Sequence, residues 1–215
     1  MKRRYKFFRK FFNIFPKFRS IYYKYWNILY FTLIGVEYGK NLTVCNKLYV
    51  TGLGKVSIGD NFKFTSGGNL NPICRNIRGS FFSMLPTSKI EIGNNVGMSS
   101  TCIWAMQSIT IGDNVHIGGD CLILDNDAHP YDYFERRDDF LNQVSRHEYL
   151  SKIASIPIIL EDDVWIGARC QILKGVHIGA RSIIAAGSIV TKNIPADVVA
   201  GGNPCKVVKE LNRQN

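Results

Sequence analysis

The stretch LEDDVWIGARCQILKGVHIGARSIIAAGSIV, residues 160–190, repeats a pattern every six residues. An aliphatic side chain returns at every sixth position: Leu160, Ile166, Ile172, Ile178, Ile184 and Val190. The position four residues after each of the first five is small or β-branched: Val164, Cys170, Val176, Ser182 and Ser188. A period of six fits neither an α-helix nor ordinary hairpins. It predicts a β-solenoid in which three hexapeptides form one triangular coil.

The same pattern continues upstream of this stretch and is interrupted twice. IGDNVHIGGDCLI, residues 111–123, repeats the phrase closely, and looser copies reach back to about residue 36. The interruptions fall at about 65–90 and 125–157, and neither gap is a multiple of six residues. Because a rigid prism accommodates an insertion by looping it outward, we expect two loops there. We also expect small residues at the tight corners, where glycine supplies backbone freedom.

These observations predict one all-β domain with short additions at both ends. The chain of 215 residues is long enough for one sizeable core and too short for two comfortable domains. The solenoid is assigned to residues 37–204, after an arm at 1–36 and before a short helix or tail at 205–215. Its aliphatic side chains point inward, and its coils stack at about the 4.8 Å spacing of neighbouring strands.

The arm at 1–36 carries almost all of the excess positive charge. It contains nine Lys and Arg residues and no Asp or Glu, whereas the whole chain has a formal net charge of +10. It also holds half of the aromatic side chains. Basic and aromatic residues together are typical of a helix that lies on an anionic membrane surface. The rest of the chain is nearly neutral, so no nucleic-acid partner is expected.

The arm is predicted to be helical and to contact a membrane surface; packing on the core or on a neighbouring subunit is the alternative. No stretch of the chain reaches the roughly 18 apolar residues of a membrane span. The arm lacks the uninterrupted apolar segment and the small-residue cleavage site of a signal peptide. We therefore expect a cytoplasmic protein that is peripheral at the inner face of the membrane.

The cysteines form no recognisable site. They are scattered along the chain without a CxxC motif or a Cys/His cluster: Cys45, Cys74, Cys102, Cys121, Cys170 and Cys205. Reduced thiols are expected in the cytosol, and no metal site is expected.

The second interruption begins with DNDAHPYDYFERRDDF, residues 125–140, where acids, aromatics and arginines surround one histidine. Imidazole titrates near neutral pH and is suited to general-base catalysis, so His129 is the candidate catalytic residue. A carboxylate or a carbonyl on its other ring nitrogen would fix the tautomer, and among the acids Asp127 is preferred over Asp125 and Asp132 for this role. The candidate acceptor-binding residues are Asn126, Tyr131, Arg136 and Arg137. For the two arginines, salt bridges with neighbouring acids are the alternative.

Three phrases, together with the repeat, resemble the hexapeptide-repeat acyltransferases, whose fold is a left-handed parallel β-helix. The phrases are AHP at 128–130, EDDVWIGARCQILKGVHIGA at 161–180 and IIAAGSIVTKNIPADVVAGGNPCKVVKE at 183–210. Within that family the chain is most similar to the maltose and galactoside acetyltransferases and their polysaccharide O-acetyltransferase relatives. The resemblance covers about residues 90–212 and leaves the first 36 residues outside.

The resemblance implies a homotrimer with active sites between adjacent prisms, acetyl-CoA as the co-substrate and no required metal. His129 matches the catalytic histidine of the family. The positions that match its CoA contacts are Ala168, Ala186, Thr191, Lys192, Lys206 and Lys209. Trp165 matches the tryptophan beside the acyl-binding region, with core packing as its alternative role. A backbone N–H near Ala168 is implied as the donor to the oxyanion.

The leading hypothesis is an acetyl-CoA-dependent O-acetyltransferase with a sugar acceptor. The membrane-suited arm favours a cell-surface polysaccharide, such as lipopolysaccharide or capsule, or its lipid-linked precursor. One alternative is N-acetylation of an amino sugar or acetylation of an antibiotic. An alternative of another class is a non-catalytic β-helix that serves as a scaffold or binding protein.

Overall fold

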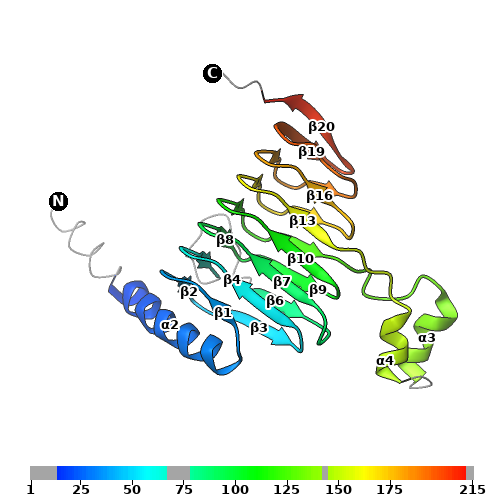
Figure 1. Cartoon of the computed structure of the whole chain (residues 1–215), viewed down its shortest axis with the longest axis horizontal. Helices are drawn as coiled ribbons and strands as arrows, with labels where there is room; N and C mark the ends of the chain where they lie inside the picture. Colours follow the sequence, from blue (N-terminus) through cyan, green and yellow to red (C-terminus); the bar gives the residue numbers. More distant parts are fainter. Residues whose placement is uncertain (1–13, 67–77, 142–144, 212–215) are drawn as a thin grey trace, which may run out of the picture.

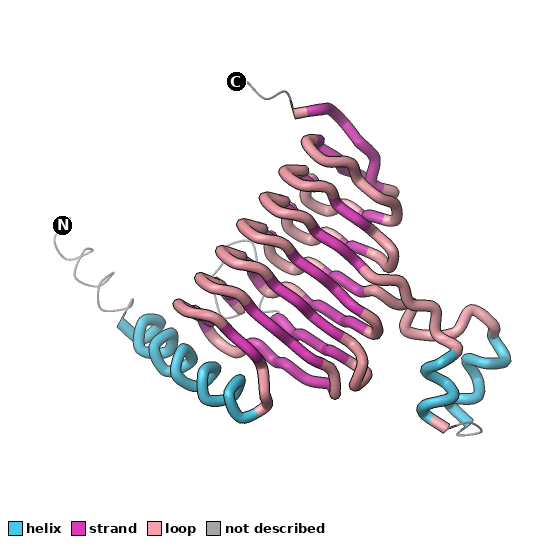
Figure 2. The backbone as a smooth tube through the Cα atoms, in the orientation of Figure 1, coloured by secondary structure: helices cyan, strands magenta, loops and turns pink. Residues whose placement is uncertain are grey.

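A computed structural model gives the structure of residues 14–66, 78–141 and 145–211. In this part of the chain three sheets form the sides of a triangular prism (Figure 1 and Figure 2). Sheet A contains β1 (Glu37–Tyr38), β4 (Lys55–Ile58), β7 (Lys89–Ile92), β10 (Ser108–Ile111), β13 (Ile158–Leu160) and β16 (His177–Ile178). Sheet B contains β2 (Thr43–Cys45), β5 (Lys63–Thr65), β8 (Gly97–Ser99), β11 (His116–Ile117), β14 (Trp165–Ile166), β17 (Ile183–Ile184), β19 (Val198–Gly202) and β20 (Cys205–Glu210). Sheet C contains β3 (Leu48–Gly52), β6 (Gly79–Ser83), β9 (Cys102–Ala105), β12 (Leu122–Leu124), β15 (Gln171–Ile172) and β18 (Ile189–Val190).

The register of the strands confirms the predicted solenoid. The aliphatic positions of one coil pair with those of the next: Leu160 with Ile178, Ile166 with Ile184, and Ile172 with Val190. All six side chains are buried in one continuous core. Full burial of an aliphatic side chain contributes about 1.5–3 kcal/mol, so this inward stack is the main stabilising feature of the prism.

The corner between sheets A and B carries asparagine in its first four coils, a feature that the six-residue pattern does not predict. Asn41, Asn61, Asn95 and Asn114 all have left-handed backbone conformations, with φ between 56° and 59°. Their side-chain amides form a ladder, because each of the first three donates to the carbonyl oxygen of the next at 2.8–3.0 Å. Asparagine tolerates this conformation better than other residues with a side chain, and the ladder satisfies its polar groups.

Glycine at the same corner serves close packing and not backbone freedom. A Cβ atom added to Gly59 would lie only 2.6 Å from the carbonyl carbon of Gly93 in the next coil. The expectation that glycine supplies the left-handed positions is therefore wrong at this corner. Its actual contribution is the absence of a side chain where two coils approach each other.

Helix α2 (Ile14–Leu33) packs against β2 and covers the first coil (Figure 1). Phe31 is fully buried, and the Asn27 amide donates to the Asn46 carbonyl at 2.7 Å. The Tyr30 hydroxyl donates to the Val50 carbonyl at 2.6 Å. These side chains satisfy backbone carbonyls at the end of the prism, where no further strand pairs with the sheet.

The predicted helical arm is confirmed for residues 14–33, and its first thirteen residues lie outside the described part of the chain. No helix within the described ranges combines the length and the apolarity that crossing a bilayer requires.

The C-terminal helix predicted at 205–215 is wrong for residues 205–210, which form strand β20. This strand turns back and pairs antiparallel with β19, so that Gly202 faces Cys205 and Val198 faces Glu210. Pairing with the last rung of sheet B gives the segment hydrogen-bond partners that an isolated short helix lacks. Residues 212–215 lie outside the described part of the chain.

The first interruption is shorter than the expected 65–90. Strand β6 belongs to sheet C, where Phe81 pairs with Val50 and Ile103 and its side chain is fully buried. The coil therefore resumes at Gly79, and β7 begins at Lys89. The six-residue pattern missed β6 because its inward positions include Gly79 and Ser83, which are not aliphatic.

The second interruption leaves the prism completely. Strand β12 ends at Leu124 and β13 begins at Ile158, and the segment between them, residues 125–157, is called the excursion below. It contains helices α3 (Tyr133–Leu141) and α4 (Arg146–Ser151), which stand off the side of the prism (Figure 1 and Figure 2). The two strands that flank it both pair with their expected neighbours, so the coil continues across the insertion.

Candidate active site

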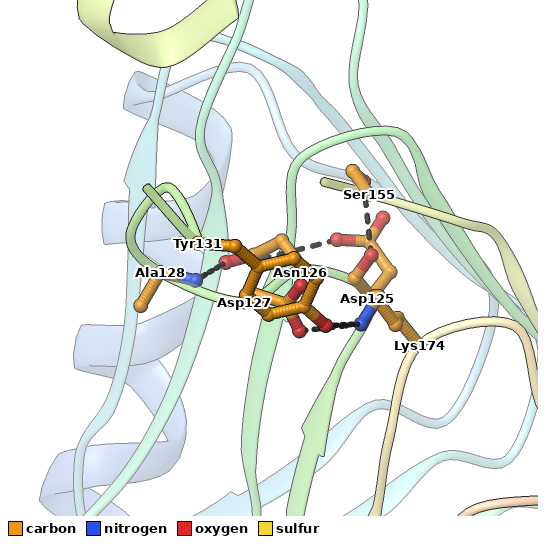
Figure 3. Close-up of polar contacts among 7 residues, drawn as sticks. All are labelled: Asp125, Asn126, Asp127, Ala128, Tyr131, Ser155 and Lys174. Carbon is orange, nitrogen blue, oxygen red and sulfur yellow. Dashed lines mark hydrogen bonds and ion pairs between the residues drawn. The ribbon is translucent and has the colours of Figure 1, made fainter. Parts of the chain in front are cut away.

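The excursion leaves the prism through a closed neck. Asp125 is fully buried, and its carboxylate oxygens accept hydrogen bonds from the backbone N–H groups of Met106, at 2.7 Å, and Gln107, at 2.8 Å. Burial raises the pKa of Asp125 above its usual value, while these hydrogen bonds oppose the rise. Asn126 forms an antiparallel bridge with Ser155, whose hydroxyl donates to the Asp125 carbonyl (Figure 3). The entry and the exit of the excursion are thus held together.

His129 follows directly from this neck. Ala128 has a left-handed φ of 62°, and its N–H donates to the side-chain oxygen of Asn126 at 2.9 Å (Figure 3). This tight turn projects His129, which is exposed, from the corner between sheets C and A. Its Nδ1 lies 2.8 Å from the hydroxyl oxygen of Tyr149, and its Nε2 has no hydrogen-bond partner among the described residues. The imidazole therefore presents one nitrogen to the protein and the other outward.

The carboxylate of Asp127 does not hold the ring of His129. Its Oδ1 lies 2.6 Å from the Nζ of Lys174, which also donates to the hydroxyl of Tyr131 at 2.8 Å (Figure 3). The hydrogen bond to Asp127, followed by that to Tyr131, raises the pKa of Lys174. The prediction that Asp127 orients His129 is therefore wrong. Asp127 instead ties the start of the excursion to the coil that follows it.

Two residues of this site, Tyr149 and Lys174, were missed from the sequence. Lys174 lies in the phrase ILKG, at the corner between β15 and β16, where it reads as an ordinary turn lysine. Tyr149 lies on α4, twenty residues after His129, with no repeat or motif around it. The return of the excursion toward the prism brings Tyr149 to the neck, and the coil that follows the excursion brings Lys174 there.

The candidate acceptor-binding residues fall into two groups. Asn126 is buried, and its amide group bonds to Asp125 and Ala128, so it holds the neck together, and its role in acceptor binding stays a prediction. The guanidinium of Arg136 donates to the carbonyl of Pro130 at 2.8 Å, and it also contacts the carbonyl of Tyr131.

The remaining two candidates are exposed aromatic or cationic groups on the outside of the excursion. Tyr131 has 74% of its surface exposed while its hydroxyl bonds to Lys174. The guanidinium carbon of Arg137 lies 5.2 Å from the ring centroid of Tyr133 and 5.7 Å from that of Phe134. Arg137 thus stacks on aromatic rings and keeps its charge at the surface.

The positions that match CoA contacts lie on more than one edge of the prism. Ala168 and Ala186 lie one above the other at the corner between sheets B and C, where the Gly187 N–H donates to the Ala168 carbonyl at 2.8 Å. Within the described residues the Ala168 N–H donates no hydrogen bond. It is thus an unpaired backbone donor at an edge of the prism different from that of His129.

The other matching positions are exposed. Thr191 and Lys192 follow β18 at the corner between sheets C and A, the edge from which the excursion also leaves. Lys206 and Lys209 lie on β20, at the last rung of sheet B. Trp165 lies on β14 with 55% of its surface exposed, so the alternative of core packing is wrong for this residue.

A cavity of about 800 Å³ lies between the excursion and the preceding coils. Its lining contains none of the predicted site residues and comes from three segments: Leu85, Pro86, Thr87 and Lys89; Met106, Gln107 and Ser108; and Leu150, Ser151, Ile153 and Ser155. It is adjacent to the neck but does not contain His129. We therefore assign the cavity neither to His129 nor to the positions that match CoA contacts.

The geometry can support proton transfer at the neck of the excursion. A fixed imidazole with an outward nitrogen can accept a proton from a hydroxyl that approaches from solvent. In the described ranges, no three His, Cys, Asp or Glu residues cluster as metal ligands would.

Comparison with known proteins concerns the repeat and the fold. Residues 157–192 match the family model described as bacterial transferase hexapeptide (six repeats). The galactoside O-acetyltransferase of Escherichia coli (strain K12) is 39% identical over 126 residues, which cover 58% of this chain and 56% of that protein. The chain thus spans little more than half the length of this curated relative.

Solved structures extend the similarity beyond the matched repeat. A galactoside acetyltransferase in complex with coenzyme A has a TM-score of 0.52 and 30% identity, and the match covers 82% of this chain and 65% of that one. A mutant of AntD, an N-acyltransferase from Bacillus cereus, has a TM-score of 0.64 at 19% identity, covering 85% and 88% of the two chains. The second likeness concerns the fold alone. Together the matches confirm the predicted resemblance to the hexapeptide-repeat acyltransferases.

Proposed function

We propose that this chain, a hexapeptide-repeat protein similar to acetyltransferases, transfers an acetyl group from acetyl-CoA to a sugar hydroxyl. The observation that carries the proposal is His129, fixed through Nδ1 and open at Nε2, at the neck of the excursion that immediately precedes the matched repeat at residues 157–192. The similarity to a galactoside O-acetyltransferase supports oxygen as the acceptor atom.

In this mechanism one proton passes from the acceptor hydroxyl to His129 and then to the leaving group. His129 Nε2 takes the proton of the acceptor hydroxyl as its oxygen attacks the thioester carbonyl. The C–S bond then breaks, and the imidazolium returns the proton to the departing thiolate of CoA. No side chain becomes acylated, so donor and acceptor must be bound together.

The remaining parts of the site come from a second copy of the chain in this proposal. The Ala168 N–H is unpaired in the described chain and can donate to the negative charge that develops on the carbonyl oxygen. It lies at the corner between sheets B and C, whereas His129 projects from the corner between sheets C and A. One prism cannot direct both groups at a single carbonyl, but neighbouring prisms in a ring can. This supports a homotrimer with active sites between subunits.

Three exposed lysines can bind the phosphates of the proposed donor, acetyl-CoA. Lys192, Lys206 and Lys209 offer positive charge to the phosphates of CoA, and none has a salt bridge in the described chain. Lysine meets phosphate as a point charge and lacks the bidentate geometry of arginine. Trp165 offers an exposed aromatic surface on sheet B for an apolar part of the donor.

The proposed acceptor is a hydroxyl of a cell-surface polysaccharide or its lipid-linked precursor. Incubation with [¹⁴C]acetyl-CoA should label such glycans, and mild alkali should release the label because the product is an ester. The assay compares deacetylated surface polysaccharide, lipid-linked oligosaccharide, free sugars and amino sugars. Alkali-stable label on an amino sugar would favour N-acetylation instead. Absence of label from every acceptor would contradict acetyl transfer.

Helix α2 supports a membrane-surface location for the reaction. Its outward face carries large apolar and aromatic side chains at helical spacing: Phe18, Tyr22, Tyr25, Leu29 and Leu33, each 55–75% exposed. The opposite face packs on the first coil through Phe31. The segment up to residue 36 has nine cations and no acid, so it complements an anionic lipid surface.

We expect the full-length protein to co-sediment with vesicles that contain about 30% phosphatidylserine, and less with neutral vesicles or at high salt. A variant with Tyr22→Ser, Tyr25→Ser and Leu29→Ser should bind these vesicles roughly tenfold more weakly, because it loses apolar contact area. Leu53→Ser, at an exposed residue of the prism, is the control. Equal sedimentation of the triple variant and the wild type would assign the outward face of α2 to another role.

A further inference from the structure

The partner of the His129 imidazole is a tyrosine and not a carboxylate. The hydroxyl oxygen of Tyr149 lies 2.8 Å from Nδ1, and the two rings meet edge to face, with centroids 6.4 Å apart and an interplanar angle of 70°. Tyr149 is only 3% exposed. A buried hydroxyl at this distance is a well-placed hydrogen-bond partner for the ring.

All three acids near His129 are committed to other partners. Asp125 accepts from the backbone of residues 106 and 107, and Asp127 pairs with Lys174. Asp132 accepts from the N–H groups of residues 134 and 135 and so caps the start of α3. None of these carboxylates makes a hydrogen bond to the imidazole in the described chain.

Tyr149 is held in place by a group of buried side chains that is not part of the core of the prism. Helix α4 is capped by Ser145, whose Oγ accepts from the Glu148 N–H at 3.2 Å. Tyr149 and the adjacent Leu150 pack in a small core separate from that of the prism, with Met84, Met106 and Ile153. This second core fixes the tyrosine hydroxyl against the neck.

We propose that Tyr149 is the positioning residue for His129 and sets the tautomer that the proposed base requires. A neutral imidazole carries one N–H, and a base that acts through Nε2 must carry it on Nδ1. The Tyr149 oxygen accepts that N–H and keeps the Nε2 lone pair directed outward. The excursion therefore carries both the base, His129, and its hydrogen-bond partner, Tyr149. The second core holds Tyr149 in position. This inference rests on the proposed function for its kinetic readout only.

The test combines a spectroscopic and a kinetic measurement on the full chain. In ¹⁵N-histidine NMR spectra, with the His129 signals identified by their loss in His129→Ala, the wild type should show the Nδ1–H tautomer. Tyr149→Phe should mix the two tautomers and lower kcat roughly 10- to 100-fold, with the KM for acetyl-CoA unchanged. Tyr133→Phe, at an exposed tyrosine of the same excursion, should change neither.

Two results would overturn the proposal. One is an Nε2–H tautomer of His129 in the wild type, a result that does not depend on the Tyr149→Phe variant. The other is a Tyr149→Phe protein that keeps both the wild-type tautomer and the wild-type kcat. If the wild type transfers no acetyl group, the proposed function fails, but the NMR measurement still decides the role of Tyr149.

Discussion

Replacing His129 by alanine is expected to lower kcat/KM for acetyl transfer by roughly 10²- to 10⁴-fold. The alanine variant has no group at the neck that can take the proton of the acceptor hydroxyl. Lys174 is engaged with Asp127 and Tyr131, and a positive ammonium is not a base. The loss should appear in kcat, because the proposed donor contacts lie on other residues and remain intact.

The measurement is the rate of [¹⁴C]acetyl transfer, accompanied by calorimetric titration of CoA. CoA affinity should stay within about threefold of the wild type, since His129 acts on the transition state and not on uniform binding. His177→Ala is the matched control, because His177 lies on β16 of sheet A and pairs with Glu161 at 2.7 Å, away from the excursion. Full activity in the His129 variant would remove the base from the proposed mechanism.

Replacing Phe64 by alanine is expected to lower the free energy of unfolding by about 3–5 kcal/mol. Phe62, Phe64 and Phe81 are all fully buried, and the Phe64 ring centroid lies 6.2 Å from that of Phe62 and 5.8 Å from that of Phe81. The substitution leaves a cavity inside the coil formed by β4, β5 and β6 and removes both aromatic contacts. Rigid stacked sheets limit how far the neighbouring coils can move to fill it.

Urea unfolding followed by circular dichroism measures this change, and the midpoint should fall without a change in secondary structure at zero denaturant. Phe18→Ala is the control, because Phe18 is 68% exposed on the outward face of α2. That variant should stay within about 0.5 kcal/mol of the wild type. Similar losses for the two variants would mean that burial in the prism does not govern stability here.

The prism was predictable from the sequence because each coil depends on contacts that recur at a fixed interval. A residue such as Ile172 meets an equivalent residue, Ile123, on the rung before it and Val190 on the rung after it. The spacing of aliphatic residues alone therefore specifies the partner of each rung. The prediction was wrong at β6, where small inward residues hide the repeat, and at β20, where pairing with a single strand decides the structure.

The site was predictable only where it follows the repeat. His129 could be placed because the coil ends immediately before it, at Leu124. The partners at the neck could not be placed, because Tyr149 meets His129, and Lys174 meets Asp127, through contacts that do not recur at the six-residue interval. Sequence proximity favoured Asp127 as the partner of His129, but in the structure the Asp127 carboxylate pairs with Lys174. Contacts of this kind carry no periodic signal.

The closed ends of the prism determine how copies of this protein can associate. A bare end of a parallel stack exposes a row of backbone donors and acceptors that templates further strands, as in amyloid fibres. Here Asn27 and Tyr30 occupy carbonyls at one end, and β20 folds back over the other. In the described chain these contacts occupy some of the backbone groups that end-to-end pairing would use. The proposed ring, in which copies meet through their lateral faces, would be closed and would not extend along the axis of the prism.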